Sequence, residues 1–285
     1  MIMIEKKVHT VPFLTVWFAK EPLKHQGIVL YREAAFVGNE KAEPFDTLIS
    51  DLTETEEEMK QHLSKSCKYK VNRAPRENVT FQIKKSEEII DEEIGGFLDF
   101  FQEFWESKGV SFTEKEELKE ELLAYRELGT LTLSTAYIEG KAAVYHTHLF
   151  DKDVARLLHS ASLYREIEKN EIADTAGDAE HEQKITDEDT EKATKSAAKE
   201  KDNSRNLVGM ANRYLHFEEM KYFKQQGIRS YDWGGAGKGE DVLSITEFKE
   251  SFGGEHVTFH DFTIVTGLKA KLVTALSNLR HRATT

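Results

Sequence analysis

The segment from Asn206 to Asp261 constrains the fold more than any other part of the sequence, because four elements follow one another there in a fixed order. A helix is expected to begin at Asn206. A short strand then ends in Tyr-Asp-Trp-Gly-Gly (231–235), and a second helix carries Phe-Lys-Glu-Ser-Phe-Gly-Gly (248–254). The alternating residues 256–261 predict a further strand. This order indicates helices that cover a β-sheet.

The residues before this segment extend the pattern towards the N-terminus. Val79–Ile83 alternates as a strand does, and residues 90–105 repeat apolar side chains at helical spacing, followed by a shorter helix. Two-residue periodicity and tight polar turns then predict an antiparallel meander of three strands. These strands are expected at residues 131–138, 142–150 and 154–163.

Composition limits the class of protein. With 285 residues and 39% hydrophobic residues, the chain is long enough to bury a sizeable core. The net charge of −12 argues against a DNA-binding surface, and the single Cys67 excludes an internal disulfide. No apolar run reaches the length of a membrane span. The apolar residues 11–19 contain Pro12 and predict a strand, paired with residues 26–32, instead of a signal peptide. A cytoplasmic protein is expected.

Two stretches are unusual in charge. Residues 166–204 hold thirteen acidic residues against six lysines and contain no aromatic residue, which predicts a flexible, acidic insertion. Residues 65–76 are basic instead. A helix from about Glu54 would place Lys68 and Arg73 near one face, either as a solvated surface or as an anion site for substrate phosphates.

The meander contains three histidines that invite a metal assignment. His146 and His148 share one face of their strand, and His159 is expected on the other face, opposite Tyr145. A metal would need a third ligand that nothing nearby in the sequence supplies. No metal site is therefore expected, and His146 is a candidate to line a substrate cleft.

The motifs Tyr-Asp-Trp-Gly-Gly and Phe-Lys-Glu-Ser-Phe-Gly-Gly, in this order and on these elements, resemble the GNAT superfamily of acyltransferases. The closer resemblance is to the Fem-type peptidoglycan aminoacyltransferases and their smaller relatives. It implies a central mixed, mostly antiparallel sheet with two splayed parallel strands, flanked by helices. Residues 79–265 would form a complete GNAT domain and residues 1–78 a truncated second one, with an amphipathic helix over 266–285.

The resemblance places the acyl donor at the start of the helix predicted from Asn206. In GNAT enzymes the corresponding helix N-terminus offers backbone N–H groups to the pyrophosphate of coenzyme A. Acyl-CoA is therefore the expected co-substrate, without a tightly bound cofactor. In the Fem-type branch the donor is an aminoacyl-tRNA, which stays an alternative, as does a helix cap without a ligand. The residues concerned are Asn206, Leu207, Val208, Gly209, Met210 and Ala211.

Three side chains are expected to carry the chemistry. By resemblance, Lys249 would stabilise the negative charge that develops during acyl transfer. Asp232 could bind or deprotonate an amine, or cap the following loop. Glu218 projects from the apolar arc of its helix, as a buried anchor or a member of the active cleft, whereas His216 is expected to be exposed. Further substrate contacts are assigned to Tyr231, Trp233, Gly234 and Phe248.

The sequence thus predicts an N-acyltransferase whose acceptor is a small-molecule or cell-envelope amine. A tRNA is a partner only under the aminoacyl-tRNA alternative, and a degenerate binding module is the third. The C-terminal stripe of Leu268, Leu272, Leu276 and Leu279 is expected to pack on its own domain, with peripheral membrane contact as the alternative.

Overall fold

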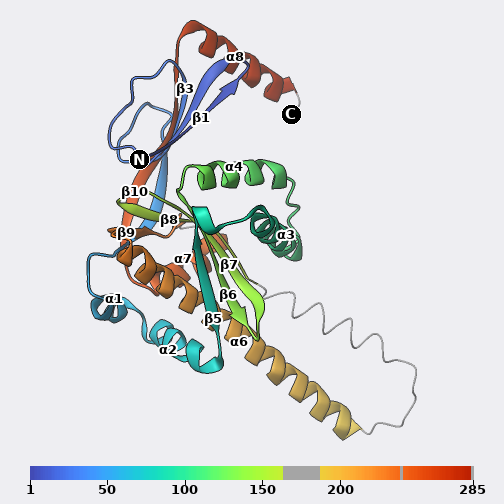
Figure 1. The fold of residues 1–285 in the computed structure, drawn as a ribbon. Coiled ribbons are helices and arrows are strands. Elements are labelled where there is room, and N and C mark those ends of the chain that lie inside the picture. Colours follow the sequence, from blue (N-terminus) through green and yellow to red (C-terminus); the bar gives the residue numbers. More distant parts are fainter. Residues whose placement is uncertain (163–186, 238–239, 284–285) are drawn as a thin grey trace. The chain divides into compact units, whose positions relative to one another are not determined.

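The structure is a computed structural model that describes residues 1–162, 187–237 and 240–283; within these ranges it leaves the side chains of 187–203, 240–242 and 276–283 undescribed. The chain forms two compact units (Figure 1). The first unit comprises residues 1–50, 232–250 and 254–285, and the second comprises 51–231 and 251–253. The units do not follow the expected boundaries at residues 78 and 265.

The second unit contains the predicted meander. Strand β5 (Thr80–Lys85) pairs antiparallel with β6 (Leu131–Ile138), which pairs with β7 (Lys141–Phe150), and β7 pairs with β8 (Val154–Ser162). Strand β9 (Ser230–Asp232) follows β8 in the strand order. The chain leaves the second unit within β9, between its second and third residues.

Helices cover both faces of this meander. Helix α3 (Asp91–Ser107) contacts β8, and α4 (Lys115–Glu127) contacts β6 on the same face (Figure 1). The long helix α6 (Asp187–Gln225) lies on the other face, against β6 and β7. The core under α6 is apolar. It contains Val79, Ala136, Val144, Val208, Ala211 and Leu215.

The start of α6 differs from the prediction. The expected helix start at Asn206 is wrong, because the helix already begins at Asp187. The part of the acidic insertion from Asp187 onwards therefore belongs to this helix, whereas residues 163–186 lie outside the described residues. Backbone N–H groups around Gly209 are consequently inside a helix, where they donate to carbonyls one turn earlier.

The basic segment also differs in detail. Instead of one helix from Glu54, the structure has α1 (Glu56–His62) and α2 (Lys65–Arg73). The chain is extended at Leu63, and the Ser64 hydroxyl caps the second helix by accepting from the backbone N–H of Cys67 at 3.2 Å. Helix α2 packs on α6, and the short 3₁₀ helix η1 (Ala74–Glu77) leads into β5.

The first unit joins strands from distant parts of the chain. Its strand order is β1 (Ile2–Val8), β2 (Val11–Trp17), β3 (Gly27–Ala34), β10 (Glu255–Thr266) and β4 (Glu43–Asp51). The predicted pairing of residues 11–18 with 26–32 is confirmed, and the two strands run parallel. Strand β10 lies between β3 and β4 and is antiparallel to both.

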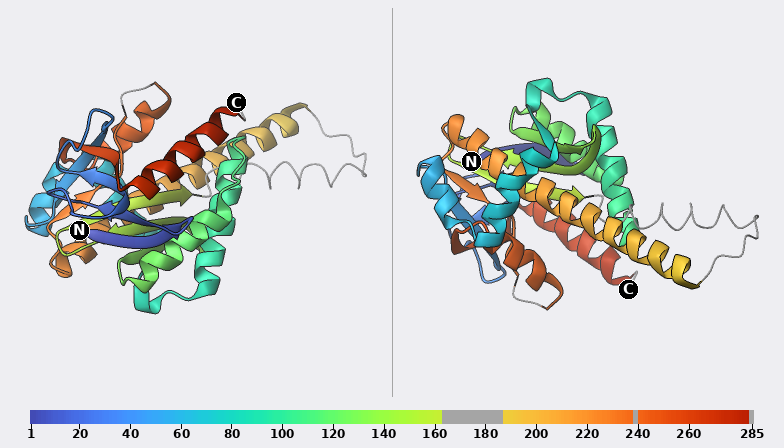
Figure 2. Two further views of the ribbon diagram at one scale, coloured as in Figure 1. Left: turned by 90° about the horizontal axis from the view of Figure 1, so that it is seen from above. Right: turned by 90° about the horizontal axis from the view of Figure 1, so that it is seen from below.

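Two described helices belong to the first unit, α7 (Glu240–Glu250) and α8 (Leu268–Ala283) (Figure 2). Helix α8 packs through Ala270 and Val273 onto a cluster that includes Val11 and Ile28. The predicted leucine stripe is wrong where it can be examined, since Leu268 is 78% exposed and Leu272 57% exposed. Among the described helices, none combines the length and the apolar character that crossing a membrane requires.

Candidate functional site

The loop after β9 holds a buried carboxylate in the first unit. Asp232 is fully buried, and its Oδ1 atom accepts hydrogen bonds from the Thr47 hydroxyl at 2.6 Å and from the backbone N–H of Gly234 at 2.8 Å. Its Oδ2 atom has no hydrogen-bond partner among the described residues. Buried carboxylate oxygens are normally paired, which sets this oxygen apart from Oδ1 of the same carboxylate.

Lys249 is also buried in the first unit and faces the same loop. Its ammonium donates to the carbonyl oxygens of Gly234, at 3.0 Å, and Gly235, at 2.6 Å. Both glycines have positive φ, of 65° and 87°, which favours glycine and turns their carbonyls towards the lysine. Lys249 therefore fixes the backbone beside Asp232, while the role that the resemblance assigns to it stays a prediction.

The other residues predicted around this loop are buried or half-buried. Trp233 is fully buried, and its indole N–H donates to the Ser50 hydroxyl at 2.9 Å. Phe248 is half-buried on α7. Tyr231 directs its hydroxyl into the second unit, where it meets a group of buried histidines.

These histidines belong to a group that we call the histidine cluster, which consists of His146, His148, His216, Glu219 and Tyr231. All five side chains are at most 1% exposed. Strand β7 supplies the first two residues, helix α6 the next two and strand β9 the last. The cluster lies entirely within the second unit.

The Glu219 carboxylate is at the centre of the histidine cluster. The His146 Nδ1 atom lies 2.9 Å from its Oε1 atom. The Nε2 atom of His148 and the Nδ1 atom of His216 lie 3.4 and 3.3 Å from Oε2. The Tyr231 hydroxyl donates to Oε2 at 3.2 Å. The same hydroxyl oxygen is 2.9 Å from His148 and 3.0 Å from His216, so it can accept from both imidazoles.

Burial and proximity set the charges of the cluster. Burial lowers the pKa of His148 and, together with the adjacent His146, lowers that of His216 to about 3, so both rings are neutral at neutral pH. Burial acts to raise the pKa of Glu219, but His146 and His148 outweigh it and hold that pKa well below its usual value. The second nitrogen of His146 lies 3.0 Å from the Asn212 amide oxygen, so both nitrogens of this ring have a partner within hydrogen-bond distance.

The cluster corrects the reasoning about a metal. The ligand atoms of His146, His216 and Glu219 lie within 4.8 Å of one another, so helix α6 does supply the missing ligands. However, the two imidazoles stack with centroids 4.0 Å and planes 21° apart. Rings bound to one tetrahedral ion would approach it from directions about 109° apart. The arrangement therefore fits a hydrogen-bond network centred on Glu219 better than a metal centre.

Two residues of α6 differ from their predicted positions. His216 was expected to be exposed, and this prediction is wrong because the ring is 1% exposed and stacks on His146. The buried carboxylate of the helix is Glu219, whereas its neighbour Glu218 is half-buried and pairs with Lys221 at 2.8 Å. A rotation of the apolar arc by about one residue position, near 100°, explains both differences.

The residues assigned to the donor lie along α6 and are mostly structural. Val208, Met210 and Ala211 are buried in the core, and Leu207 packs against it. Gly209 accepts a hydrogen bond from Arg213 at 3.3 Å through its carbonyl. Their assignment depended on a helix start at Asn206, and it loses that support.

The basic residues of α2 remain at the surface. Lys68 is exposed, and Arg73 pairs with Glu77 at 2.7 Å and with the Tyr69 hydroxyl. A cavity of about 430 Å³ lies beside them and is lined in addition by Asn72 and Arg76. Since Arg73 already has a carboxylate partner, an anion would have to compete with Glu77.

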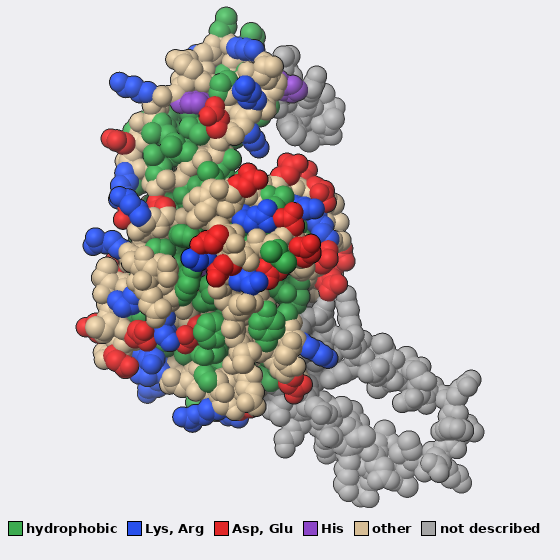
Figure 3. Space-filling view, in the orientation of Figure 1, with side chains coloured by type: hydrophobic (Ala, Val, Ile, Leu, Met, Phe, Trp, Pro, Cys, Tyr) green, Lys and Arg blue, Asp and Glu red, His purple; other side chains and the backbone are tan. Residues whose placement is uncertain are grey.

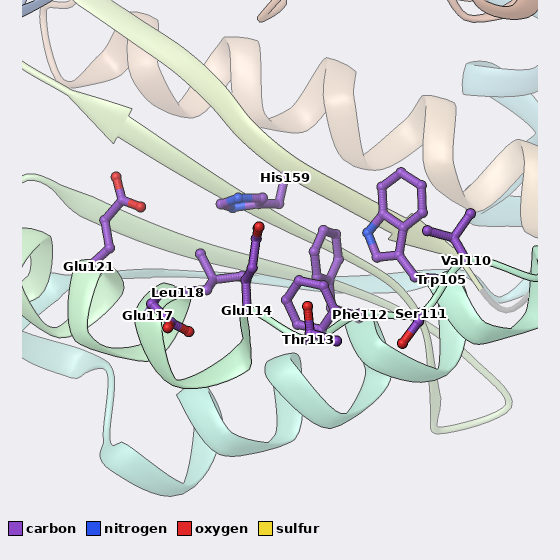
Figure 4. A pocket seen from close by; sticks show the side chains of 11 residues that line it. Trp105, Val110, Ser111, Phe112, Thr113, Glu114, Glu117, Leu118, Glu121 and His159 are labelled. Atoms are coloured by element: carbon purple, nitrogen blue, oxygen red, sulfur yellow. The ribbon is translucent and has the colours of Figure 1, made fainter. Parts of the chain in front are cut away.

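A larger cavity of about 610 Å³ lies in the second unit, between the end of α3, the start of α4 and strand β8 (Figure 4). It was not predicted, because its residues come from three elements. His159 on β8 lies at this cavity, on the face of the sheet opposite the histidine cluster. This face is confirmed, although His159 pairs with Thr147 in the sheet instead of Tyr145, next to a β-bulge.

Comparisons with known proteins identify the fold. No protein-family model matches the chain, and no curated protein matches it significantly. Among solved structures, FemX matches with a TM-score of 0.51 at 12% identity, over 81% of this chain and 63% of that chain. The C-terminal DUF2156 domain of a putative lysylphosphatidylglycerol synthetase from Agrobacterium fabrum matches at 12% identity with a TM-score of 0.48, over 88% and 72%.

A conserved protein of unknown function from Bacteroides thetaiotaomicron matches at 11% identity with a TM-score of 0.47, over 79% of this chain and 62% of that chain. The chain therefore spans less than two thirds of the length of this protein and of FemX. The likeness to FemX confirms the predicted α+β, GNAT-like fold. The chain therefore has an α+β, GNAT-like fold to which the structure of FemX is similar.

Proposed function

We propose that the protein is an acyltransferase that forms an amide bond on an amine acceptor. The observation that carries this proposal is the Asp232 carboxylate, whose Oδ2 atom is buried and has no partner among the described residues. A carboxylate oriented by Thr47 and Gly234 through its other oxygen is suited to accept a proton from an ammonium group. The GNAT-like fold supports the same class of reaction.

In the proposed reaction Asp232 takes one proton from the acceptor ammonium. The neutral amine then attacks the carbonyl carbon of an activated ester or thioester, and a C–N bond forms while the C–O or C–S bond breaks. The leaving oxygen or sulfur ends with a proton, and the product is an amide. Lys249 acts as a positioning residue, because it holds the Gly234–Gly235 carbonyls that border Asp232.

Acyl-CoA is the first proposed donor, as the resemblance to GNAT enzymes implies. Aminoacyl-tRNA is the second, and two observations favour it. The structural likeness to FemX is one of them. The other is the continuous course of α6 through Gly209, which removes the helix N-terminus expected to bind a pyrophosphate there.

The test measures amide formation by mass spectrometry with acetyl-CoA or with charged tRNA as donor and a mixture of primary amines as acceptors. We expect Asp232→Asn to lower the rate about a hundredfold or more, because the amide cannot accept the proton. The matched control is Asp46→Asn. Asp46 also accepts a threonine hydroxyl, that of Thr258 at 2.5 Å, but at an exposed position.

The control variant should keep the wild-type rate, and both variants should keep the wild-type unfolding temperature within a few degrees. Amide formation by neither donor, or an Asp232→Asn variant that folds and retains its rate, would overturn the proposal. A folded protein that binds coenzyme A without turnover would support the degenerate binding module instead.

A further inference from the structure

We propose that the cavity between α3, α4 and β8, which we call the aromatic pocket, binds a primary amine attached to an aromatic or similarly flat apolar group. Asp232 does not line this pocket, so the inference goes beyond the proposed function and does not rest on it. The aromatic pocket is lined by Phe101, Trp105, Val110, Ser111, Phe112, Thr113, Glu114, Glu117, Leu118, Glu121 and His159 (Figure 4).

The walls of the aromatic pocket are rings set edge to face. The Phe101 ring is nearly perpendicular to Trp105 (85°) and to Phe112 (89°), with centroids 6.0 and 5.3 Å away. It also meets His159 at 5.2 Å. Such rings offer both flat apolar surface and π-faces that attract a cation. The volume of about 610 Å³ lies in the range of small-molecule sites.

The rim of the aromatic pocket is acidic. Glu114, Glu117 and Glu121 line it, and no lysine or arginine does so among the described residues. In Figure 3 acidic side chains gather over α4, the helix that carries two of these glutamates. A concave surface with charge of one sign raises the local concentration of ligands of the opposite sign. The lining therefore selects a cation over a neutral or anionic molecule.

Two lysines near the pocket have partners of their own. Lys115 pairs with Asp99 at 2.5 Å, and Lys108 lies over the rings of Phe104 and Trp105, at 3.8 and 5.1 Å from their centroids. Burial, and to a lesser extent Arg156, lowers the pKa of His159 to about 4, so this ring is uncharged at neutral pH. The charge of the lining itself is thus that of the three glutamates.

The shape of the lining fits an amine with an aromatic tail. The ring of such a ligand would lie among Phe101, Trp105 and Phe112, and its ammonium would point towards Glu114 and Glu117. Glu121 contributes charge but already accepts the hydroxyl proton of Tyr125. An ammonium held by exposed carboxylates retains part of its hydration, so moderate affinity with strong charge selectivity is expected.

The experiment compares three probes of the same shape and different charge, namely 2-phenylethylamine, 2-phenylethanol and 3-phenylpropionate. Binding to the full-length protein is followed by the fluorescence of Trp105, which lines the pocket, whereas Trp17 and Trp233 are buried elsewhere. We expect the amine to bind at least tenfold more tightly than the alcohol, and the carboxylate not to bind measurably. Trp105→Phe should remove the fluorescence signal while calorimetry still detects binding.

A matched pair of double variants tests the rim. Glu114→Gln with Glu117→Gln removes two charges from the pocket lining, and Glu116→Gln with Glu120→Gln removes two exposed charges from the same helix outside the lining. The first pair should weaken amine binding about five- to tenfold at low ionic strength, and the second less than twofold. The difference should shrink in 0.5 M salt, at a screening length of roughly 4 Å.

Equal affinity for the three probes, or an equal loss in both double variants, would overturn the aromatic pocket as an amine site. If the first double variant fails to fold, the probe comparison on the wild-type protein still decides. Because binding is measured without a donor, charge-selective binding by a protein without transferase activity would refute the proposed function alone.

Discussion

At the scale of single residues, the hydrogen-bond partners of a buried polar group indicate what that group does. The motif alone suggests that Lys249 takes part in the reaction, but its ammonium donates hydrogen bonds to the carbonyls of two glycines. Asp232 holds one oxygen in fixed bonds and keeps the other without a partner among the described residues. Sequence motifs singled out both residues, but they could not assign burial or hydrogen bonds.

Lys249→Met tests the positioning role. The substitution leaves the carbonyls of Gly234 and Gly235 without their donor, and we expect a loss of about 1–3 kcal/mol in the free energy of unfolding. Lys269→Met on α8 is the control, since that side chain is exposed. Urea denaturation measures both. A Lys249→Met protein with wild-type stability but no transferase activity would instead favour the direct role at the reacting carbonyl.

His159 makes stability depend on pH. Its folded-state pKa of about 4 lies below the unfolded value of about 6.5. The unfolded state therefore binds more protons between these values, so stability is complete above pH 6.5 and falls as the pH is lowered towards 4. His159→Gln should remove up to about 2 kcal/mol of this decrease, discounted for the partly exposed ring. Unfolding curves at pH 7 and 4.5 measure it, and parallel decreases in both proteins would contradict it.

At the scale of elements, helix α6 shows which features apolar periodicity predicts and which require the structure. Its apolar spacing predicted that it packs on the sheet, and the core under it agrees. Periodicity alone could not fix the start of the helix or the rotation of its buried face. The sequence reasoning therefore placed Glu218 within the apolar arc, where the structure buries Glu219. It also missed that α6 brings His216 to His146 across 70 residues of sequence.

The different environments of Glu218 and Glu219 lead to a prediction in which one residue serves as the control for the other. Glu219→Gln removes the negative charge at the centre of the histidine cluster and replaces one of its two acceptor oxygens with an amide NH2 group. We expect it to destabilise the protein by about 3–5 kcal/mol. Glu218→Gln changes a partly exposed pair with Lys221 and should cost less than about 1 kcal/mol. Thermal and urea unfolding compare the two, and similar stabilities would show that the cluster is not centred on Glu219.

At the scale of the whole molecule, the meander with its covering helices was predictable, because each of its elements is local in sequence. The strand order of the first unit was not predictable beyond the pairing of β2 with β3. Strand β10 pairs with β3 over a separation of more than 220 residues, and no period or turn signal reports a contact of that range. The sequence analysis predicted the strand itself but placed it in a domain of residues 79–265, whereas its partners β3 and β4 precede residue 79.

Two truncations test the place of β10. A chain that ends at Gly254 lacks the strand between β3 and β4, and we expect the amides of both strands to lose protection in hydrogen exchange. A chain that ends at Thr266 lacks only α8, whose buried contacts centre on Ala270, and should retain that protection. The second unit should stay protected in both. Protection of β3 in the shorter chain would contradict the strand order.

The position of β10 also sets an order of events during synthesis. The first fifty residues are synthesised early, yet the strand that lies between β3 and β4 is complete only when residue 266 has been made. The second unit, which is nearly continuous in sequence, can complete its folding meanwhile. Until β10 has been synthesised, the edges of β3 and β4 that will pair with it are open and can pair with other strands. A chaperone would therefore be needed most during this part of translation.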